Sequence, residues 1–197
     1  MSVWIIIPTK PFAEGKTRLD SVLDRDSRER LNRQLYQHTL ECALEVYPPD
    51  RIVVVSRSVE ARQIARMRQV HTVRESGDAL NEAVAQATDY SLRAGATGIL
   101  SLSCDLPFLV PQDLLAMLGV DERPSAFLAP DRSGKGTNAL TISPAEKFAW
   151  QFGTNSFRLH LAEAHRLGAA VRTIATEGLA FDLDTPVDFQ DWKAKRV

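Results

Sequence analysis

The sequence predicts an α/β fold in which a largely parallel sheet is covered by helices. Short apolar runs rich in β-branched residues recur along the chain. They alternate with longer stretches in which apolar residues have helical spacing, the pattern of consecutive βα units. No linker, low-complexity segment or internal repeat interrupts this alternation. We therefore expect residues 1–197 to form a single domain.

The predicted strands share an apolar, β-rich composition and are bounded by turn residues or by helical stretches. Such runs are typical of strands in a sheet that is covered on both faces. In chain order the predicted strands are Val3–Pro8, Arg51–Ser56, Gln69–Arg74, Gly98–Leu102, Ser125–Ala129, Asn138–Ile142 and Val171–Ile174.

The first predicted helix is the longest, from about Arg25 to Tyr47, and Pro48 and Pro49 end it. Its apolar stripe consists of Leu31, Leu35, Leu40, Ala43 and Leu44.

Further helices are predicted at Val59–Met67 and at Ala79–Arg93, the second of which ends near Gly95. Pro111 begins a short helix, because proline is favoured in the first helical turn. An amphipathic helix follows the loop residues 152–156, and the polar turn of residues 130–136 is predicted to be a second loop beside a site.

The composition is that of an ordinary globular protein, and its charge indicates a small-molecule partner. Of the 197 residues, 44% are hydrophobic, and the net charge is -1. This charge argues against a nucleic-acid or membrane-surface protein. No apolar run approaches the roughly 20 residues needed to span a bilayer and no signal peptide is recognisable, so we expect a cytoplasmic protein. Cys42 and Cys104 are expected to be reduced and packed.

Three cationic residues follow the first predicted strand. Lys10, Lys16 and Arg18 lie within nine residues of one another, at the carboxyl end of a strand, where α/β proteins bind their ligands. A polyphosphate site is one interpretation of this loop. A solvated basic turn is the alternative.

Carboxylates follow two other segments. Asp105 comes directly after the predicted strand Gly98–Leu102, and Asp182 and Asp184 have the spacing that places them on one face of an extended segment. Mg²⁺ needs only one or two protein carboxylates when substrate phosphate and water complete its shell. The alternative is that Asp184 or Thr185 caps the helix that Pro186 begins, with Asp105 a turn residue.

Candidate anion ligands lie in the second half of the chain. Residues 131–138 carry glycines, hydroxyls and cations, although such loops are often plain turns. Gly153 and Ser156 lie at a helix start, where backbone N–H groups favour an anion, although Ser156 could be a simple N-cap. His160 follows on the same helical face and either contacts the anion or covers the surface.

Several common motifs are missing from the sequence. It contains no dinucleotide-binding glycine motif, no true phosphate-binding loop and no nucleophile elbow. No nucleophile–base pair can be proposed from His38, His71, His160 and His165. A dehydrogenase or a hydrolase is therefore not expected.

Taken together, these motifs resemble the 2-phospho-L-lactate guanylyltransferase family of coenzyme F420 biosynthesis, which includes phosphoenolpyruvate and 3-phosphoglycerate guanylyltransferases. The resemblance runs in order from residue 8 to residue 188. The matching motifs are Pro8-Thr9-Lys10, Gly15-Lys16-Thr17-Arg18-Leu19, Asp105-Leu106-Pro107, Gly136-Thr137-Asn138, Phe152-Gly153 with Ser156-Phe157 and His160, and Asp182 with Asp184-Thr185-Pro186.

The resemblance implies a single-domain nucleotidyltransferase-type fold, like that of nucleotide-diphospho-sugar transferases, with a mixed, mainly parallel sheet. It also implies transfer of GMP from GTP to 2-phospho-L-lactate, phosphoenolpyruvate or 3-phospho-D-glycerate, with Mg²⁺ as cofactor. A homodimer is possible. Cys104 replaces the alanine that is commoner before the Asp-Leu-Pro motif, which we expect to alter packing more than chemistry.

The resemblance further implies a role for each candidate residue. Lys10, Lys16 and Arg18 would face the triphosphate of GTP and act in catalysis together with Asp105. Asp105 with Asp182 or Asp184 would hold Mg²⁺. Asn81, in the segment Gly77-Asp78-Ala79-Leu80-Asn81, would lie on the nucleotide side. Thr137, Gly153, Ser156 and His160 would form the acceptor side.

The expected chemistry needs no general base, because a phosphate monoester is already anionic at neutral pH. One alternative is a molybdopterin or sugar-1-phosphate nucleotidyltransferase, although these commonly carry a glycine-rich loop that the segment from Lys10 to Arg18 lacks. The other is a nucleotide-binding regulator without catalysis, which loss of a metal-binding carboxylate would favour; the candidate carboxylates are intact.

Overall fold

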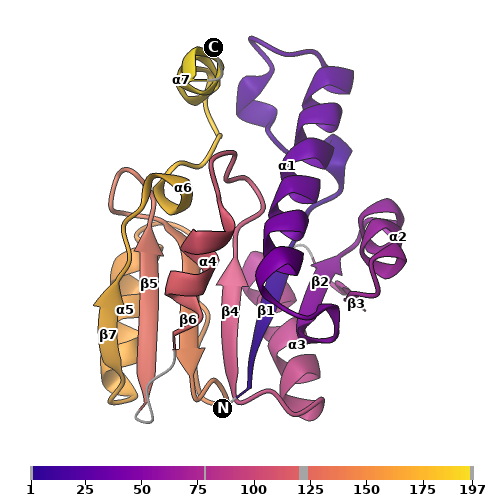
Figure 1. Cartoon of the computed structure of the whole chain (residues 1–197). Coiled ribbons are helices and arrows are strands. Elements are labelled where there is room, and N and C mark those ends of the chain that lie inside the picture. Colours follow the sequence, from indigo (N-terminus) through magenta and orange to yellow (C-terminus); the bar gives the residue numbers. More distant parts are fainter. Residues whose placement is uncertain (1, 78, 120–123, 196–197) are drawn as a thin grey trace.

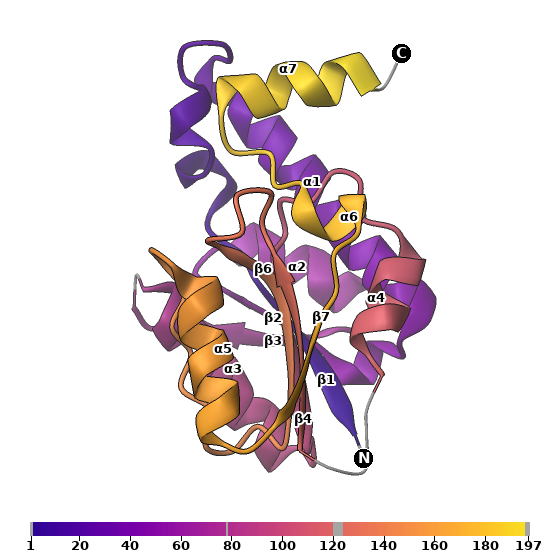
Figure 2. The same cartoon turned by 90° about the vertical axis from the view of Figure 1, so that its left-hand side faces the viewer.

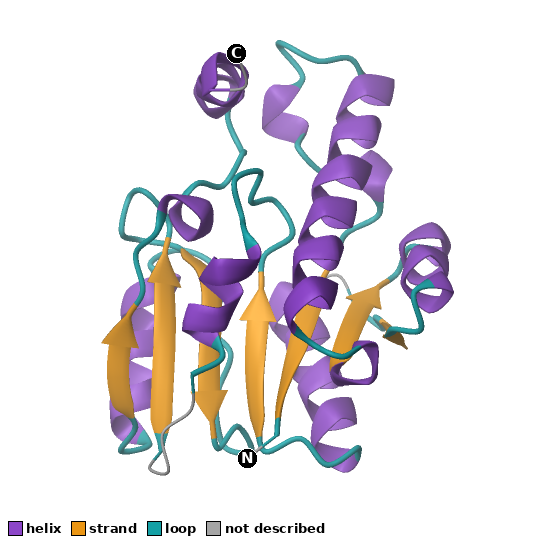
Figure 3. Cartoon of the chain, in the orientation of Figure 1, coloured by secondary structure: helices purple, strands orange, loops and turns teal. Residues whose placement is uncertain are grey.

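The computed structural model describes residues 2–77, 79–119 and 124–195. Its centre is a seven-stranded sheet in the order β3-β2-β1-β4-β6-β5-β7, shown in Figure 1 and by element type in Figure 3. The strands are β1 (Val3–Pro8), β2 (Ile52–Ser56), β3 (His71–Arg74), β4 (Gly98–Leu102), β5 (Ser125–Pro130), β6 (Thr137–Ser143) and β7 (Ala170–Thr173).

Every neighbouring pair of strands is parallel except the two pairs that contain β6. Strand β6 follows β5 after the short loop of residues 131–136, which is long enough for a hairpin and too short for a crossover. The mixed, mainly parallel sheet predicted from the sequence is confirmed. The predicted strand start at Gln69 is two residues early, because Gln69 has a left-handed backbone (φ 62°) that ends the preceding helix.

The helices are α1 (Arg25–Val46), α2 (Val59–Met67), α3 (Leu80–Arg93), α4 (Pro111–Met117), α5 (Ser156–Arg166), α6 (Glu177–Ala180) and α7 (Pro186–Lys195). Three 3-10 turns cover Phe12–Glu14, Thr17–Leu19 and Pro49–Arg51. The last of these includes Arg51, which the sequence assigned to the second strand. Helix α6, four residues long, has no helical period that sequence could reveal.

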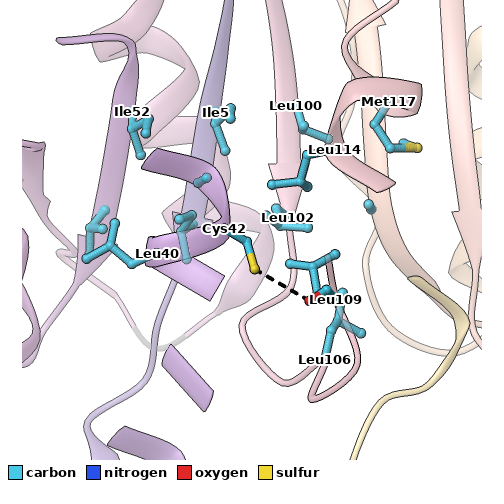
Figure 4. Packing of buried hydrophobic residues seen from close by; sticks show 14 of the residues in the cluster. Ile5, Leu40, Cys42, Ile52, Leu100, Leu102, Leu106, Leu109, Leu114 and Met117 are labelled. Atoms are coloured by element: carbon cyan, nitrogen blue, oxygen red, sulfur yellow. Dashed lines mark hydrogen bonds between the residues drawn. The ribbon is translucent and has the colours of Figure 1, made fainter. Parts of the chain in front are cut away.

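The helices form a layer on each face of the sheet (Figures 1 and 2). In β1, Ile5 and Ile7 pack with α1, α2 and α4, whereas Trp4 and Ile6 pack with α3 and α5. Figure 4 shows the first of these two cores, in which the thiol of Cys42 donates to the carbonyl of Leu109 at 3.4 Å. Because β1 is buried on both faces, its run has no polar alternation.

A third apolar cluster lies beyond the carboxyl edge of the sheet. Leu19, Leu31, Leu35, Phe181 and Leu183 join the first loop, α1 and the segment before α7. Helix α7 and the amino-terminal half of α1 project past the sheet on this side (Figure 2). This cluster fixes the two segments that carry Lys16 and Asp184. In the described part of the chain, no helix combines the length and apolarity needed to cross a membrane.

Candidate active site

A cleft of about 470 Å³ opens at the carboxyl ends of β1 and β4. Its volume is within the range usual for small-molecule sites. Six of the residues predicted for the site line it, namely Lys10, Lys16, Arg18, Asp105, Thr137 and Asp184. The position agrees with the rule that ligands of α/β sheets bind outside the carboxyl ends of strands.

The loop after β1 is folded so that Lys16 points inward. Lys16 has a left-handed backbone (φ 56°), which costs a residue with a side chain on the order of 1–2 kcal/mol. Asn32 of α1 donates to the carbonyl of Phe12 at 2.7 Å and packs against Gly15, where a Cβ atom would lie 2.7 Å from the Asn32 amide. Strain at a residue held this firmly by its surroundings is typical of a functional site.

Lys16 forms an ion pair with two carboxylates at once. Its Nζ atom lies 2.8 Å from Oδ2 of Asp105 and 2.8 Å from Oδ1 of Asp184. Burial alone would lower the Lys16 pKa, but the two carboxylates outweigh burial and raise it above its usual value. Burial likewise works to raise the Asp105 pKa, and Lys16 outweighs it, so that the Asp105 pKa is lowered. Lys16 and Asp105 are therefore both charged at neutral pH.

Asp184 is not the helix cap that the alternative interpretation of the sequence allowed. Thr185 and Asp188 form the cap of α7: the Asp188 carboxylate accepts from the Thr185 amide at 2.7 Å, and the Thr185 hydroxyl accepts from the Asp188 amide at 3.3 Å. The Asp184 side chain therefore faces the cleft. The exposed Arg18 guanidinium lies 3.7 Å from Oδ2 of Asp184.

Asp182 lies close to the other two carboxylates and has a different environment. Asn138 donates to its Oδ1 atom at 3.5 Å. Burial, with Asp105 next in weight, raises the pKa of Asp182 to about 6. The sequence did not decide whether Asp182 or Asp184 acts together with Asp105. In the structure, Asp184 is the one that shares the Lys16 ammonium with Asp105.

The residues present fit a divalent cation. One ammonium already bonds to Asp105 and Asp184, which shows that both carboxylates can reach a single cation. Within the described ranges, no group of three or more His, Cys, Asp or Glu side chains is arranged to hold a metal. This set of oxygen ligands suits Mg²⁺ completed by substrate phosphate and water, and does not suit a closed structural site.

Thr137 forms the wall of the cleft opposite the first loop. Its Oγ1 atom lies 3.3 Å from Oγ of Ser156, the first residue of α5. Gly153, with φ 127°, turns the chain just before this helix. The amides of Ser156 and Phe157 donate to the carbonyls of Gly153 and Lys135, so these two N–H groups of the helix start have protein partners.

His160 lies behind this wall. It is completely buried, and its ring contacts those of Phe148, Trp150 and Phe152. Its Nε2 atom accepts from the Gln151 amide at 3.0 Å, and its Nδ1 atom lies 3.0 Å from Oγ1 of Thr137. The geometry places His160 next to Thr137, inside the protein.

Asn81 holds the segment that leads to Gly153. Its side chain accepts from the Phe152 amide at 2.6 Å and donates to the Phe152 carbonyl at 3.1 Å. Phe152 lines the cleft, as does Leu80 at the start of α3. Asp78, in the same predicted nucleotide-side segment, lies outside the described residues.

The loop of residues 131–136 is held by the protein itself. The Asp131 carboxylate accepts from the Lys135 amide and the Ser133 hydroxyl, both at 2.9 Å. Arg132 pairs with Asp188 and Asp191 of α7, and its guanidinium lies 4.2 Å from the centre of the Phe181 ring. The Ser133 hydroxyl, the Lys135 amide and the Arg132 guanidinium, which lie in a loop predicted to bind an anion, therefore bond to the loop itself and to α7.

Sequence reasoning did not predict how three residues orient the site, although it named Asn138 as part of a motif. Ser103 donates to Asp105 at 2.8 Å, Asn32 holds the first loop, and Asn138 contacts Asp182. Ser103 and Asn138 adjoin Asp105 or Thr137 in the sequence, a signal that could have found them. Asn32 lies inside a long helix, where nothing local distinguishes it.

Comparisons with known proteins identify the family and the fold of the chain. The family model described as "Guanylyl transferase CofC like" matches residues 3–192. A phosphoenolpyruvate guanylyltransferase of Rubrobacter xylanophilus is 36% identical over 189 residues, covering 95% of this chain and 92% of that protein.

Two solved structures share the fold. A protein of Desulfovibrio desulfuricans, assigned to the nucleotide-diphospho-sugar transferases, has a TM-score of 0.73 at 16% identity, covering 100% of this chain and 88% of the other. A nucleotidyl transferase from Methanothermobacter has a TM-score of 0.71 at 12% identity, covering 98% and 97%. The fold predicted from the sequence is confirmed, and the chain belongs to the CofC-like guanylyl transferase family.

Proposed function

We propose that this protein transfers GMP from GTP to phosphoenolpyruvate and releases pyrophosphate, as a Mg²⁺-dependent step of coenzyme F420 biosynthesis. Family membership supports guanylyl transfer, and the relative's name supports the acceptor. The observation that carries the proposal is the Asp105–Lys16–Asp184 arrangement facing Thr137 across the cleft. It combines a cation-binding pair of carboxylates with cationic groups for polyphosphate.

The nucleotide side of the proposed site is the first loop. Lys10, Lys16 and Arg18 all line the cleft. Lys10 and Arg18 present exposed positive charge suited to a triphosphate, whereas the Lys16 ammonium is paired with Asp105 and Asp184 until a ligand competes for it. Asp105 and Asp184 would hold Mg²⁺, which when bound neutralises the charge that develops on the phosphate oxygens. Asn81 acts through Phe152 and shapes the wall beside Leu80, where we place the nucleoside.

The acceptor supplies its own nucleophile. A phosphate oxygen of phosphoenolpyruvate attacks the α-phosphorus of GTP, the bond from that phosphorus to the bridging oxygen breaks, and the electron pair leaves with pyrophosphate. The acceptor phosphate is already ionised, so no proton has to be removed. The protein's task is to hold two anions in line while its cations offset their repulsion.

Pyrophosphate release by the purified chain tests the proposal. GTP, ATP, CTP and UTP are each combined with phosphoenolpyruvate, 2-phospho-L-lactate or 3-phospho-D-glycerate in the presence of Mg²⁺, and products are identified by mass. We expect release with GTP and phosphoenolpyruvate. Release with another acid would identify that acid as the acceptor in place of phosphoenolpyruvate. A different preferred nucleotide would contradict guanylyl transfer. Binding of GTP without release in any combination would favour the non-catalytic regulator.

A further inference from the structure

Behind the acceptor wall, a chain of hydrogen bonds runs from a backbone amide to the surface of the cleft. It begins at the Gln151 N–H, passes through the two ring nitrogens of His160 and reaches Oγ1 of Thr137. The Ser156 hydroxyl joins at the same Thr137 oxygen. Thr137 lines the cleft, whereas His160 is completely buried.

The Gln151 amide determines which nitrogen of His160 carries the proton. A backbone N–H can only donate, so Nε2 of His160 must be the unprotonated, accepting nitrogen. Burial lowers the pKa of His160 to about 4, so that the ring is neutral at pH 7. In a neutral imidazole the other nitrogen is protonated. Nδ1 therefore donates to Thr137.

This tautomer leaves one hydroxyl proton for the cleft. If Nδ1 were an acceptor, Thr137 could direct its proton at the ring. Because Nδ1 donates instead, neither hydroxyl proton is used in the bond to the ring. Thr137 and Ser156 each carry one hydroxyl proton, and the single hydrogen bond between them uses only one of the two. One proton lies in that bond, and within the described residues no protein acceptor takes the other. Of the two hydroxyl residues, Thr137 is the one that lines the cleft.

The residues around His160 hold its ring in the orientation that this hydrogen-bond chain requires. Three aromatic rings enclose it, and α3 fixes two of them, since Asn81 bonds to the Phe152 backbone and Thr88 accepts from the Trp150 indole at 3.1 Å. Glu163, one turn further along α5, pairs with Arg166 and accepts from the Ala149 amide at 3.0 Å.

We propose that His160 is a positioning residue for the acceptor: through its Nδ1–H it makes the Thr137 hydroxyl a hydrogen-bond donor to an ionised oxygen of a phosphate monoester. His160 itself does not touch the substrate. The identity of the anion rests on the proposed function, whereas the tautomer and the direction of the hydrogen bonds do not. The arrangement favours an acceptor oxygen that carries charge and no proton, as the phosphate of phosphoenolpyruvate does at neutral pH.

Steady-state kinetics with GTP and phosphoenolpyruvate test the role of His160. His160→Phe keeps an aromatic ring and loses both hydrogen bonds, whereas His160→Asn can present an amide N–H near the position of Nδ1. We expect His160→Phe to raise KM for phosphoenolpyruvate about tenfold, the ratio that corresponds to about 1.4 kcal/mol. KM for GTP should change less than about twofold. His160→Asn should restore most of the loss, and His165→Gln, an exposed change on the same helix, should have no effect.

A double-mutant cycle separates positioning from packing. If His160 acts through Thr137, His160→Phe should add little to KM for phosphoenolpyruvate in a Thr137→Val background. Independent, additive effects in the cycle would overturn the proposal, as would a His160→Phe enzyme whose two KM values rise equally. Thermal unfolding of each variant shows whether it is folded under the assay conditions.

The ¹⁵N spectrum of the wild-type imidazoles needs neither a variant nor activity. With His160 assigned, the proposal requires a proton on Nδ1 and none on Nε2 at pH 7. A proton on Nε2 would overturn it even if guanylyl transfer is confirmed. If the protonated Nδ1 is found and no guanylyl transfer is detected, the donor role of Thr137 stands and the proposed function fails.

Discussion

Replacing Lys16 with methionine should destabilise the protein and make it respond to divalent cations. Methionine preserves much of the length of the buried side chain and removes the ammonium that Asp105 and Asp184 share. The variant then has two neighbouring carboxylates without their common cation. Its free energy of unfolding should fall when no metal is present, because like charges repel and one of them is largely shielded from water.

The magnitude follows from the exposure of the three side chains. Lys16 is 6% exposed and Asp105 23%, whereas Asp184 is 39% exposed and is partly screened by water. Removing one partner of a buried ion pair costs about 3–5 kcal/mol. Screening of Asp184 places the expected loss near the lower limit, at about 3 kcal/mol. For a chain of this size that is a fall in Tm of roughly 6–12 °C.

Metal should reverse part of this loss in Lys16→Met and little in the wild type. If the variant binds Mn²⁺ with a Kd of about 1 mM, about 10 mM of the ion returns about 1.4 kcal/mol. In the wild type without nucleotide, Lys16 occupies the position between the carboxylates. In the proposed enzyme, Mg²⁺ binds there only together with GTP, whose phosphate oxygens complete its shell and accept from Lys16. Thermal unfolding with EDTA and with Mn²⁺ measures both effects, and Lys10→Met, an exposed lysine of the same loop, is the matched control. A Lys16→Met protein with wild-type Tm and no Mn²⁺ response would refute the reasoning.

Three further predictions concern other residues. Asp105→Asn should lower kcat by at least about 100-fold through loss of charge stabilisation, with a smaller fall in Tm than Lys16→Met; turnover near wild type would contradict the role of Asp105. Burial lowers the His160 pKa in the folded state to about 4, whereas the unfolded chain has a pKa of about 6.5. The unfolded state therefore binds the proton more tightly, and the stability that the neutral ring provides above pH 6.5 is lost as the pH falls toward about 4. His160→Asn should therefore lose less stability than wild type between pH 7 and pH 4.5 in urea unfolding, and equal losses would contradict this. Asn81→Ala removes two bonds to the Phe152 backbone and should lower the free energy of unfolding by about 2 kcal/mol while raising KM for GTP; an unchanged KM would place the nucleoside elsewhere.

The fold followed closely from sequence because its five central strands are buried on both faces and its longer helices have clear apolar stripes. The direction of β6 could not be derived from the pattern of apolar residues, since a buried run looks the same in either direction. The direction follows instead from the short loop between β5 and β6, which allows a hairpin and is too short for a parallel crossover. The missed 3-10 turns and α6 are too short to show a period.

The site was only partly accessible to sequence reasoning. Residue type and position after the carboxyl ends of β1 and β4 identified Lys16 and Asp105, because carboxyl ends of parallel strands meet at one edge. Thr137 begins β6, which runs antiparallel to β4, and only the family resemblance singled it out. Whether Asp182 or Asp184 faces Lys16 depended on the cap formed by Thr185 and Asp188, which is a tertiary detail. The inward position of His160 likewise depends on aromatic packing between α3 and α5, and helical spacing alone allowed a surface position.

Mass detection of the guanylylated acceptor most directly tests the central claim. Wild-type protein is incubated with GTP, phosphoenolpyruvate and Mg²⁺, in parallel with Asp105→Asn, and the product and pyrophosphate are quantified together. The proposed function predicts equimolar pyrophosphate and a GMP adduct of phosphoenolpyruvate from the wild type, and almost none from the variant. No adduct from a folded wild-type protein that binds GTP, or equal amounts from both proteins, would contradict it.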